Sequence, residues 1–122
     1  MARYNCELYG VVRYSLGLSY HELHAVEEAL LTGVQSLLES FSAQHIDFWG
    51  YGDMLQFQCS LPEYDVEALH ELCDGVKELL SEDIACKMVV LDKTLKNFSV
   101  YNIDPANWQE DRIDISDEHF VH

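Results

Sequence analysis

Two short sequences in this chain pair a histidine with a second possible metal ligand three residues later. One is His-Glu-Leu-His, which begins at His21, and the other is His-Glu-Leu-Cys, which begins at His70. On a helix this spacing puts both ligands on one face, but a zinc site takes at least three protein ligands. Neither sequence is the H-E-x-x-H motif of metalloproteases. We therefore predict no metal site and no cofactor.

The cysteines offer a second kind of chemistry. None of them belongs to a C-x-x-C pair, which argues against a zinc knuckle and against a thioredoxin-like redox motif. The hydrophobic alternation around them predicts that all four side chains face the core, whereas a nucleophilic thiol needs access to solvent and a lowered pKa. Buried, reduced thiols and the lack of an apolar signal sequence after Met1 predict a cytoplasmic protein. The four are Cys6, Cys59, Cys73 and Cys86.

The remaining motifs do not point to a reaction. The glycines are not spaced as a phosphate-binding loop, and carboxylates are so numerous that no catalytic pair can be singled out. We predict no catalytic residue, and the sequence favours a protein that is not an enzyme.

The elements that hold these side chains follow from the hydrophobic pattern. A chain of 122 residues, 48% of them hydrophobic, can form one core without disulfides or a structural metal. Alternation over residues 4–14 predicts a strand whose even-numbered side chains point inward. Ser19 and Glu22 fit a capping box, so a helix is predicted from Ser19 to about residue 40.

Alternating residues on both sides of residues 50–53 predict a β-hairpin. With Tyr51 and Gly52 as a two-residue loop, Phe48 lies opposite Leu55, and the hydrophobic side chains of both strands share one face. The hydrophobic pattern, together with this register, therefore predicts which face of the hairpin is buried.

The second half of the chain repeats this arrangement. A helix is predicted over residues 65–81, where Gly75 indicates a close contact, and strands are predicted over residues 84–91 and 98–103. We predict an α+β fold: a ferredoxin-like βαββαβ antiparallel sheet with two helices on one face and an extra C-terminal edge strand. The domain is predicted over residues 1–103 and an acidic tail over residues 104–122.

Charge is the most unusual property of the sequence. There are 22 acidic residues against 7 lysines and arginines, a formal net charge of −15, and residues 14–76 contain neither lysine nor arginine. Direct binding to nucleic acid or to an anionic membrane surface needs clustered basic residues, so the charge argues against both. Most acids of that stretch lie on or beside the predicted helices, which therefore present an almost purely anionic surface.

This surface leads to a first hypothesis, which is a basic protein partner. A non-enzymatic protein can dock an anionic helical face onto a basic macromolecule, as an inhibitor, an immunity protein or a nucleic-acid mimic does. The other interpretation is that the acids only keep the protein soluble. The predicted contacts are Glu28, Glu39, Glu67, Glu71, Asp74 and Glu78.

The opposite face of the predicted sheet leads to a second hypothesis. Its outward side chains include enough large apolar groups to require a cover. A second copy of the chain, the tail through Trp108 or a small molecule can supply it. The alternative function is therefore a homodimer that binds a small molecule, or acts as an enzyme, on its sheet face. The predicted residues are Tyr9, Val11, His45, Trp49, Val89 and Tyr101.

Overall fold

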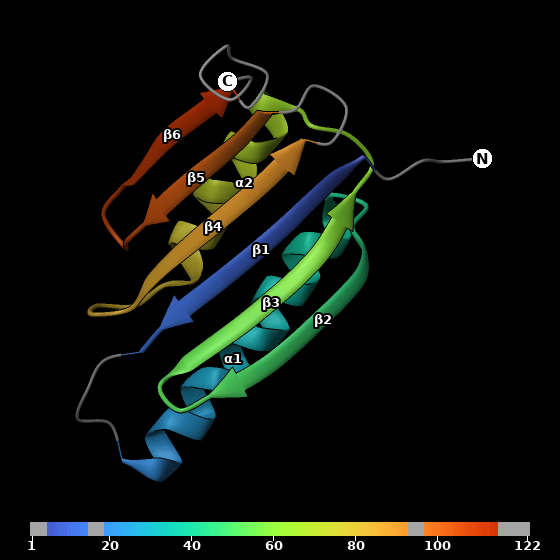
Figure 1. Ribbon diagram of the computed structural model, residues 1–122. Helices are drawn as coiled ribbons and strands as arrows, with labels where there is room; N and C mark the ends of the chain where they lie inside the picture. The colour runs from blue at the N-terminus through green and yellow to red at the C-terminus, as the bar shows by residue number, and fades with distance from the viewer. Residues whose placement is uncertain (1–4, 15–18, 93–96, 115–122) are drawn as a thin grey trace, which may run out of the picture.

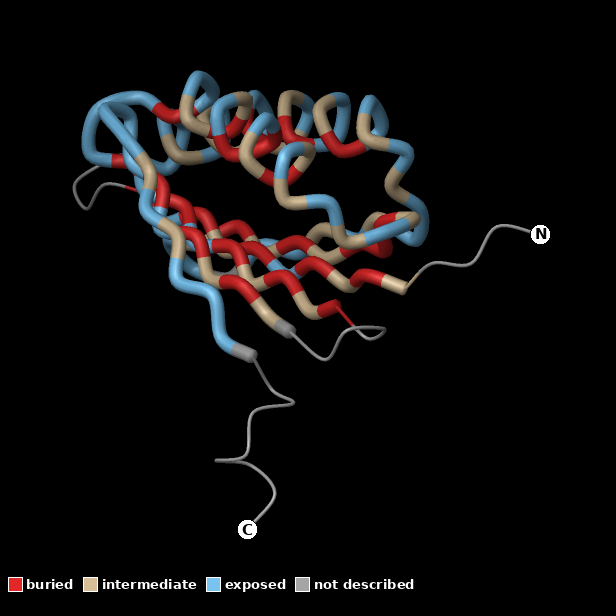
Figure 2. Tube along the Cα trace, turned by 90° about the horizontal axis from the view of Figure 1, so that it is seen from above, coloured by how far each residue is buried: buried red, intermediate tan, exposed pale blue. Residues whose placement is uncertain are grey.

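Two helices lie on one face of a six-stranded antiparallel sheet in the computed structural model, which describes residues 5–14, 19–92 and 97–114 (Figures 1 and 2). The strand order is β2-β3-β1-β4-β5-β6. The predicted α+β class, with both helices on one side, is confirmed. The elements in chain order are β1 (Cys6–Arg13), α1 (Tyr20–Ser40), β2 (Gln44–Tyr51), β3 (Met54–Leu61), α2 (Val66–Leu79), β4 (Ala85–Asp92), β5 (Asn97–Ile103) and β6 (Trp108–Asp114).

The alternation of β1 defines the inner side of the sheet. Cys6, Leu8 and Val12 are fully buried, whereas Tyr9 and Arg13 are exposed on the other face. Because β1 lies between β3 and β4, its inward side chains meet those of both neighbours beneath the helices. The predicted inward side of this strand is therefore confirmed for the described residues.

Both helices begin at a capping side chain. Ser19 Oγ accepts a hydrogen bond from the backbone N–H of Glu22 at 3.2 Å, and Asp65 accepts bonds from the N–H groups of Glu67 and Ala68. These bonds satisfy donors that have no partner inside the helix. The helix start predicted at Ser19 is confirmed.

Two glycines allow the helices to approach each other closely. A Cβ atom at Gly75 would lie 2.8 Å from Leu37 Cδ1, and one at Gly33 would lie 2.8 Å from Leu79 Cδ2. Gly33, the earlier of the two α1 residues, contacts Leu79, the later of the two α2 residues, so the two helices run antiparallel. The close contact that the sequence predicts at Gly75 is confirmed.

The β2–β3 hairpin turns one residue later than predicted. Its loop consists of Gly52 and Asp53, so Phe48 pairs with Phe57 and the predicted pairing with Leu55 is wrong. Gly52 has a φ of 63°, and a positive φ at the first loop residue favours glycine in a type II′ turn. The pairing has shifted by two residues, so the hydrophobic side chains still share the inner face.

Two strands follow β4 in the chain, where the sequence predicts one. β5 pairs with β4, and β6 pairs with β5 at the edge of the sheet. The predicted tail from residue 104 therefore differs from the structure, because Trp108–Asp114 is a strand, while residues 115–122 lie outside the described residues. The inward side of β6 includes Glu110 and Arg112, so its hydrophobic alternation is weak.

Candidate functional site

The acids predicted to contact a partner are all exposed on the two helices. Because α1 and α2 cover the same side of the sheet (Figure 2), these side chains lie on one layer of the molecule. We call this surface the acidic helical face. Its residues are Glu28, Glu39, Glu67, Glu71, Asp74 and Glu78.

Basic residues do little to neutralise the acidic helical face. Lys77 is the only lysine or arginine in either helix. Within the described part of the chain, the ion pairs converge on Glu110 of β6, and none involves a carboxylate of this face. In addition, α1 has no basic residue in its last turn, where Glu39 lies close to the negative end of the helix dipole.

Asp74 differs from the other five acids because it has a partner inside the protein. Its Oδ1 accepts a hydrogen bond from the indole Nε1 of Trp108 at 2.8 Å. This bond ties α2 to β6. Asp74 is therefore exposed on the acidic helical face and also holds the edge strand in place.

A polar cluster lies between α2 and the last two strands. Glu110 Oε2 accepts a hydrogen bond from the Tyr101 hydroxyl at 2.7 Å and lies 2.9 Å from His70 Nε2. Arg112 Nε lies 3.5 Å from the other carboxylate oxygen of Glu110, and the ring of Trp108 lies 4.8 Å from that of His70, centroid to centroid. This cluster joins α2, β5 and β6.

The cluster shifts the pKa values of its acidic groups. Partial burial alone would raise the pKa of Glu110, but the hydrogen bonds from Tyr101 and His70 outweigh it and the pKa is lowered. Burial, together with the hydrogen bond to Glu110, raises the pKa of Tyr101. Glu110 is therefore held as a carboxylate and Tyr101 as a neutral donor.

Tyr101 was predicted on the outer face of the sheet, and that prediction is wrong. Tyr101 is fully buried on the helix side, because it pairs with the inward-facing Met88 of β4. In β5 apolar residues occupy both Val100 and Tyr101, so the hydrophobic pattern does not determine which side faces in. The pairing with β4 decides it.

The other predicted sheet-face residues are divided between the outer face and an edge bulge. Tyr9 and Val89 face each other across β1 and β4, and Tyr9 and Trp49 are 46% and 43% exposed, so this face offers large aromatic surface. Val11 is half-buried there. His45 lies instead in a β-bulge of β2, with a φ of 56°. The apolar surface also extends over β5 and β6 through three residues that were not predicted from the sequence, namely Phe98, Val100 and Ile113.

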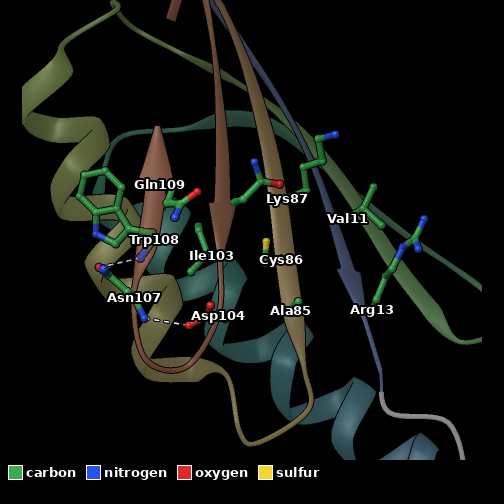
Figure 3. A pocket seen from close by; sticks show the side chains of 11 residues that line it. Val11, Arg13, Ala85, Cys86, Lys87, Ile103, Asp104, Asn107, Trp108 and Gln109 are labelled. Carbon is green, nitrogen blue, oxygen red and sulfur yellow. Dashed lines mark hydrogen bonds between the residues drawn. The ribbon is translucent and has the colours of Figure 1, made fainter. Parts of the chain in front are cut away.

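A cavity of about 580 Å³ occupies one end of the outer face (Figure 3). It spans β1, β4, β5 and β6, and it contains Arg13 and Lys87. Sequence reasoning did not single it out, because its walls come from four strands that only the sheet brings together. The side chains and backbone that line it belong to Val11, Arg13, Ala85, Cys86, Lys87, Asn102, Ile103, Asp104, Asn107, Trp108 and Gln109.

The thiols and histidines considered as reactive or metal-binding groups occupy other environments. All four cysteines are buried, and burial raises the pKa of each thiol to about 12, so they stay protonated. His70 bonds Glu110, and the ring of His24 stacks on Tyr20. Among the described residues no three metal-ligating side chains cluster, and no helix there is long and apolar enough to cross a membrane.

The chain matches no protein-family model, and comparison with curated proteins finds no match.

Proposed function

We propose that this protein is a non-enzymatic binding protein that docks its acidic helical face onto a basic macromolecular partner. Inhibitors, immunity proteins and nucleic-acid mimics are proteins of this kind. The observation that carries the proposal is the placement of exposed carboxylates, which form no ion pair with any described residue, on two antiparallel helices that share one side of the sheet.

Energetics supports a use for these acids beyond solubility. Like charges on one layer repel each other and destabilise the compact state. Interspersed lysines would relieve this repulsion and keep the protein soluble, yet only Lys77 is present on the helices. A cationic partner would convert the repulsion into attraction and would accelerate the encounter at low salt.

The test compares two sets of neutralising substitutions that change the net charge equally. The helical trio is Glu67→Gln, Glu71→Gln and Glu78→Gln, and the control trio is Asp47→Asn, Asp53→Asn and Asp111→Asn, which lies outside the helices. Partners are captured from lysate at low salt on the immobilised wild-type protein, eluted with salt and identified, and each is then purified for affinity measurements.

We expect the helical trio to weaken binding of the purified partner far more than the control trio. The on-rate should also fall steeply with salt, because the attraction is between exposed charges. Equal losses for both trios would mean that net charge alone matters, and the assignment to the helical face would be wrong.

The exposed aromatic residues favour a second candidate function, a homodimer through the outer sheet face. Tyr9 and Trp49 are nearly half exposed on a face that no described helix covers. Sedimentation of Trp49→Ala against wild type tests it. The homodimer is supported if the wild type is a dimer and the variant is a monomer that still binds the basic partner. A monomeric wild type rules the homodimer out.

The ferredoxin-like interpretation of the fold is also retained as a proposal. Its support is the order β2-β3-β1-β4 with the two crossover helices on one side, extended at β4 by β5 and β6. The buried, protonated thiols support a reducing compartment such as the cytoplasm.

A further inference from the structure

The cavity on the outer face concentrates positive charge in an otherwise acidic protein. Of the lysines and arginines in the described part of the chain, Arg13 and Lys87 line the cavity, Lys77 is on α2, and Arg112 faces Glu110. Arg13 and Lys87 are exposed and form no ion pair with any described residue. Two cations are therefore available to a ligand at this one place.

The strand register builds a polar row beside these cations. Lys87 of β4 lies opposite Asn102 of β5, which lies opposite Gln109 of β6. Residues paired across neighbouring strands point to the same face of the sheet. Because the residues paired here are exposed or half-buried, all three side chains point away from the helices. A lysine and two amides thus stand side by side across three strands.

The centre of the cavity is left open by a small residue. Arg13 pairs with Ala85, whose methyl group reaches only a short distance above the sheet. Figure 3 shows Arg13 and Lys87 on one side of this hollow and Asn107, Trp108 and Gln109 on the other. The volume of about 580 Å³ lies within the range of small-molecule sites.

One carboxylate lines the same cavity, and its local bonds limit its effect. Asp104 Oδ1 accepts hydrogen bonds from the backbone N–H groups of Ala106 and Asn107, both at 2.8 Å. These bonds hold the carboxylate in the β5–β6 turn and share its charge. Two free cations therefore outweigh one carboxylate that already has donors.

We propose that this cavity binds a small organic anion through a carboxylate or phosphate group. The oxyanion contacts Arg13 and Lys87, because guanidinium and ammonium groups form charge-assisted hydrogen bonds with such oxygens. Asn102 and Gln109 then bind polar groups on the body of the ligand. This site is separate from the acidic helical face and does not depend on the proposed partner.

The experiment titrates the full-length protein with citrate and with glucose 6-phosphate, which separate a carboxylate ligand from a phosphate ligand. Glucose is the uncharged control, and sodium chloride keeps the ionic strength constant. The side-chain NH2 resonances of Asn102, Asn107 and Gln109 in ¹H–¹⁵N spectra report binding. The variants are Arg13→Gln, Lys87→Gln and Ala85→Glu, with Lys77→Gln as the matched loss of one positive charge on α2.

We expect at least one of the two anions to shift these resonances saturably. Arg13→Gln and Lys87→Gln should each weaken that binding at least about tenfold, as loss of a charged hydrogen bond does. Ala85→Glu should abolish it by placing a carboxylate in the hollow, and Lys77→Gln should leave it unchanged.

Two results would overturn the proposal. One is the absence of a saturable shift with both anions, and the other is equal weakening by Lys77→Gln and Lys87→Gln, which would indicate only a general charge effect. The backbone resonances of each variant show whether it is folded. Basic-partner binding by Lys87→Gln is expected to persist, so failure of this proposal is distinguishable from failure of the proposed function.

Discussion

Glu39 lies where a negative charge is unfavourable for its own helix. The last turn of α1 carries the partial negative charge of the helix dipole, and no basic residue there offsets it. A stability argument alone would favour lysine or glutamine at this position. The acid therefore fits a role in recognition, at some cost to the helix.

We predict that Glu39→Gln stabilises the protein while weakening partner binding. Removing the charge should raise the free energy of unfolding by about 0.3–1 kcal/mol, the usual size of a helix-dipole interaction. Urea denaturation measures it, with Glu28→Gln, away from both ends of α1, as the control with little effect. A loss of stability in Glu39→Gln would contradict the dipole argument.

Glu110 makes stability depend on pH in the acid range. Its pKa is lowered in the folded protein, so its ionised form is stabilised by folding; this contribution is present above its ordinary value of 4.5 and is lost as the pH falls through the lowered pKa. We predict that Glu110→Gln is less stable than wild type at neutral pH and that the difference shrinks below pH 4.5.

Denaturation of both proteins across pH 3 to 7 checks this prediction, in an interval chosen to bracket the ordinary pKa of about 4.5 for a glutamate. Tyr101→Phe removes one hydrogen bond to Glu110, so the stability of this variant should depend less steeply on pH than that of the wild type. A difference between wild type and Glu110→Gln that stays constant with pH would contradict the lowered pKa.

At the scale of elements, the strands and helices that have a regular hydrophobic pattern or a clear capping residue are predicted from the sequence. β1 and β4 alternate cleanly, and the start of α1 is marked by Ser19, so these features are predicted correctly. The inward-facing side of β5 is not predicted correctly, because Val100 and Tyr101 are both apolar and only the pairing with β4 decides which of them faces the helices.

The edge strand shows a second limit on prediction from sequence. The inward side of β6 carries Glu110 and Arg112, whose charges resemble those of a solvated tail. Glu110 is tolerated there because Tyr101 of the neighbouring strand β5 and His70 of α2, which lies far earlier in the sequence, supply its partners. Glu110 in turn pairs with Arg112. The anion cavity has the same origin, since its two cations and two amides come from four different strands.

The central strand contains a glycine that the packing of its neighbour requires. Gly10 pairs with Phe57, and a Cβ atom at Gly10 would lie 2.0 Å from the Cζ atom of the phenylalanine ring. Phe57 is itself 1% exposed, so its ring has little room to move. We predict that Gly10→Ala lowers the free energy of unfolding by about 1–3 kcal/mol, as overpacking of a core does.

Chemical denaturation of a double-mutant cycle tests the cause of this loss. Phe57→Leu removes the ring atoms nearest to residue 10, so Gly10→Ala should cost much less in that background than in the wild type. Equal costs in both backgrounds would show that the ring is not responsible and that backbone conformation is.

At the scale of the whole molecule, net charge sets how stability responds to salt. With a formal charge of −15, repulsion among carboxylates opposes the compact state. We predict that the melting temperature rises between about 10 mM and about 150 mM sodium chloride, as the Debye length falls from about 30 Å to about 8 Å.

The two trios show where the repulsion arises. The rise with salt should be smaller in the helical trio than in the control trio, because the acids of α1 and α2 share one layer. Calorimetric melting curves at both salt concentrations supply the comparison. Identical salt responses in the two trios would indicate that the repulsion is spread evenly over the surface.

The borders of the sheet restrict how copies of this protein can assemble. β2 and β6 are the outermost described strands, and β2 is interrupted by the bulge at His45 while β6 exposes Asp111 and Arg112. Irregular or charged border strands discourage the addition of further strands. Growth into open-ended fibres by strand addition is therefore disfavoured at both described borders of the sheet.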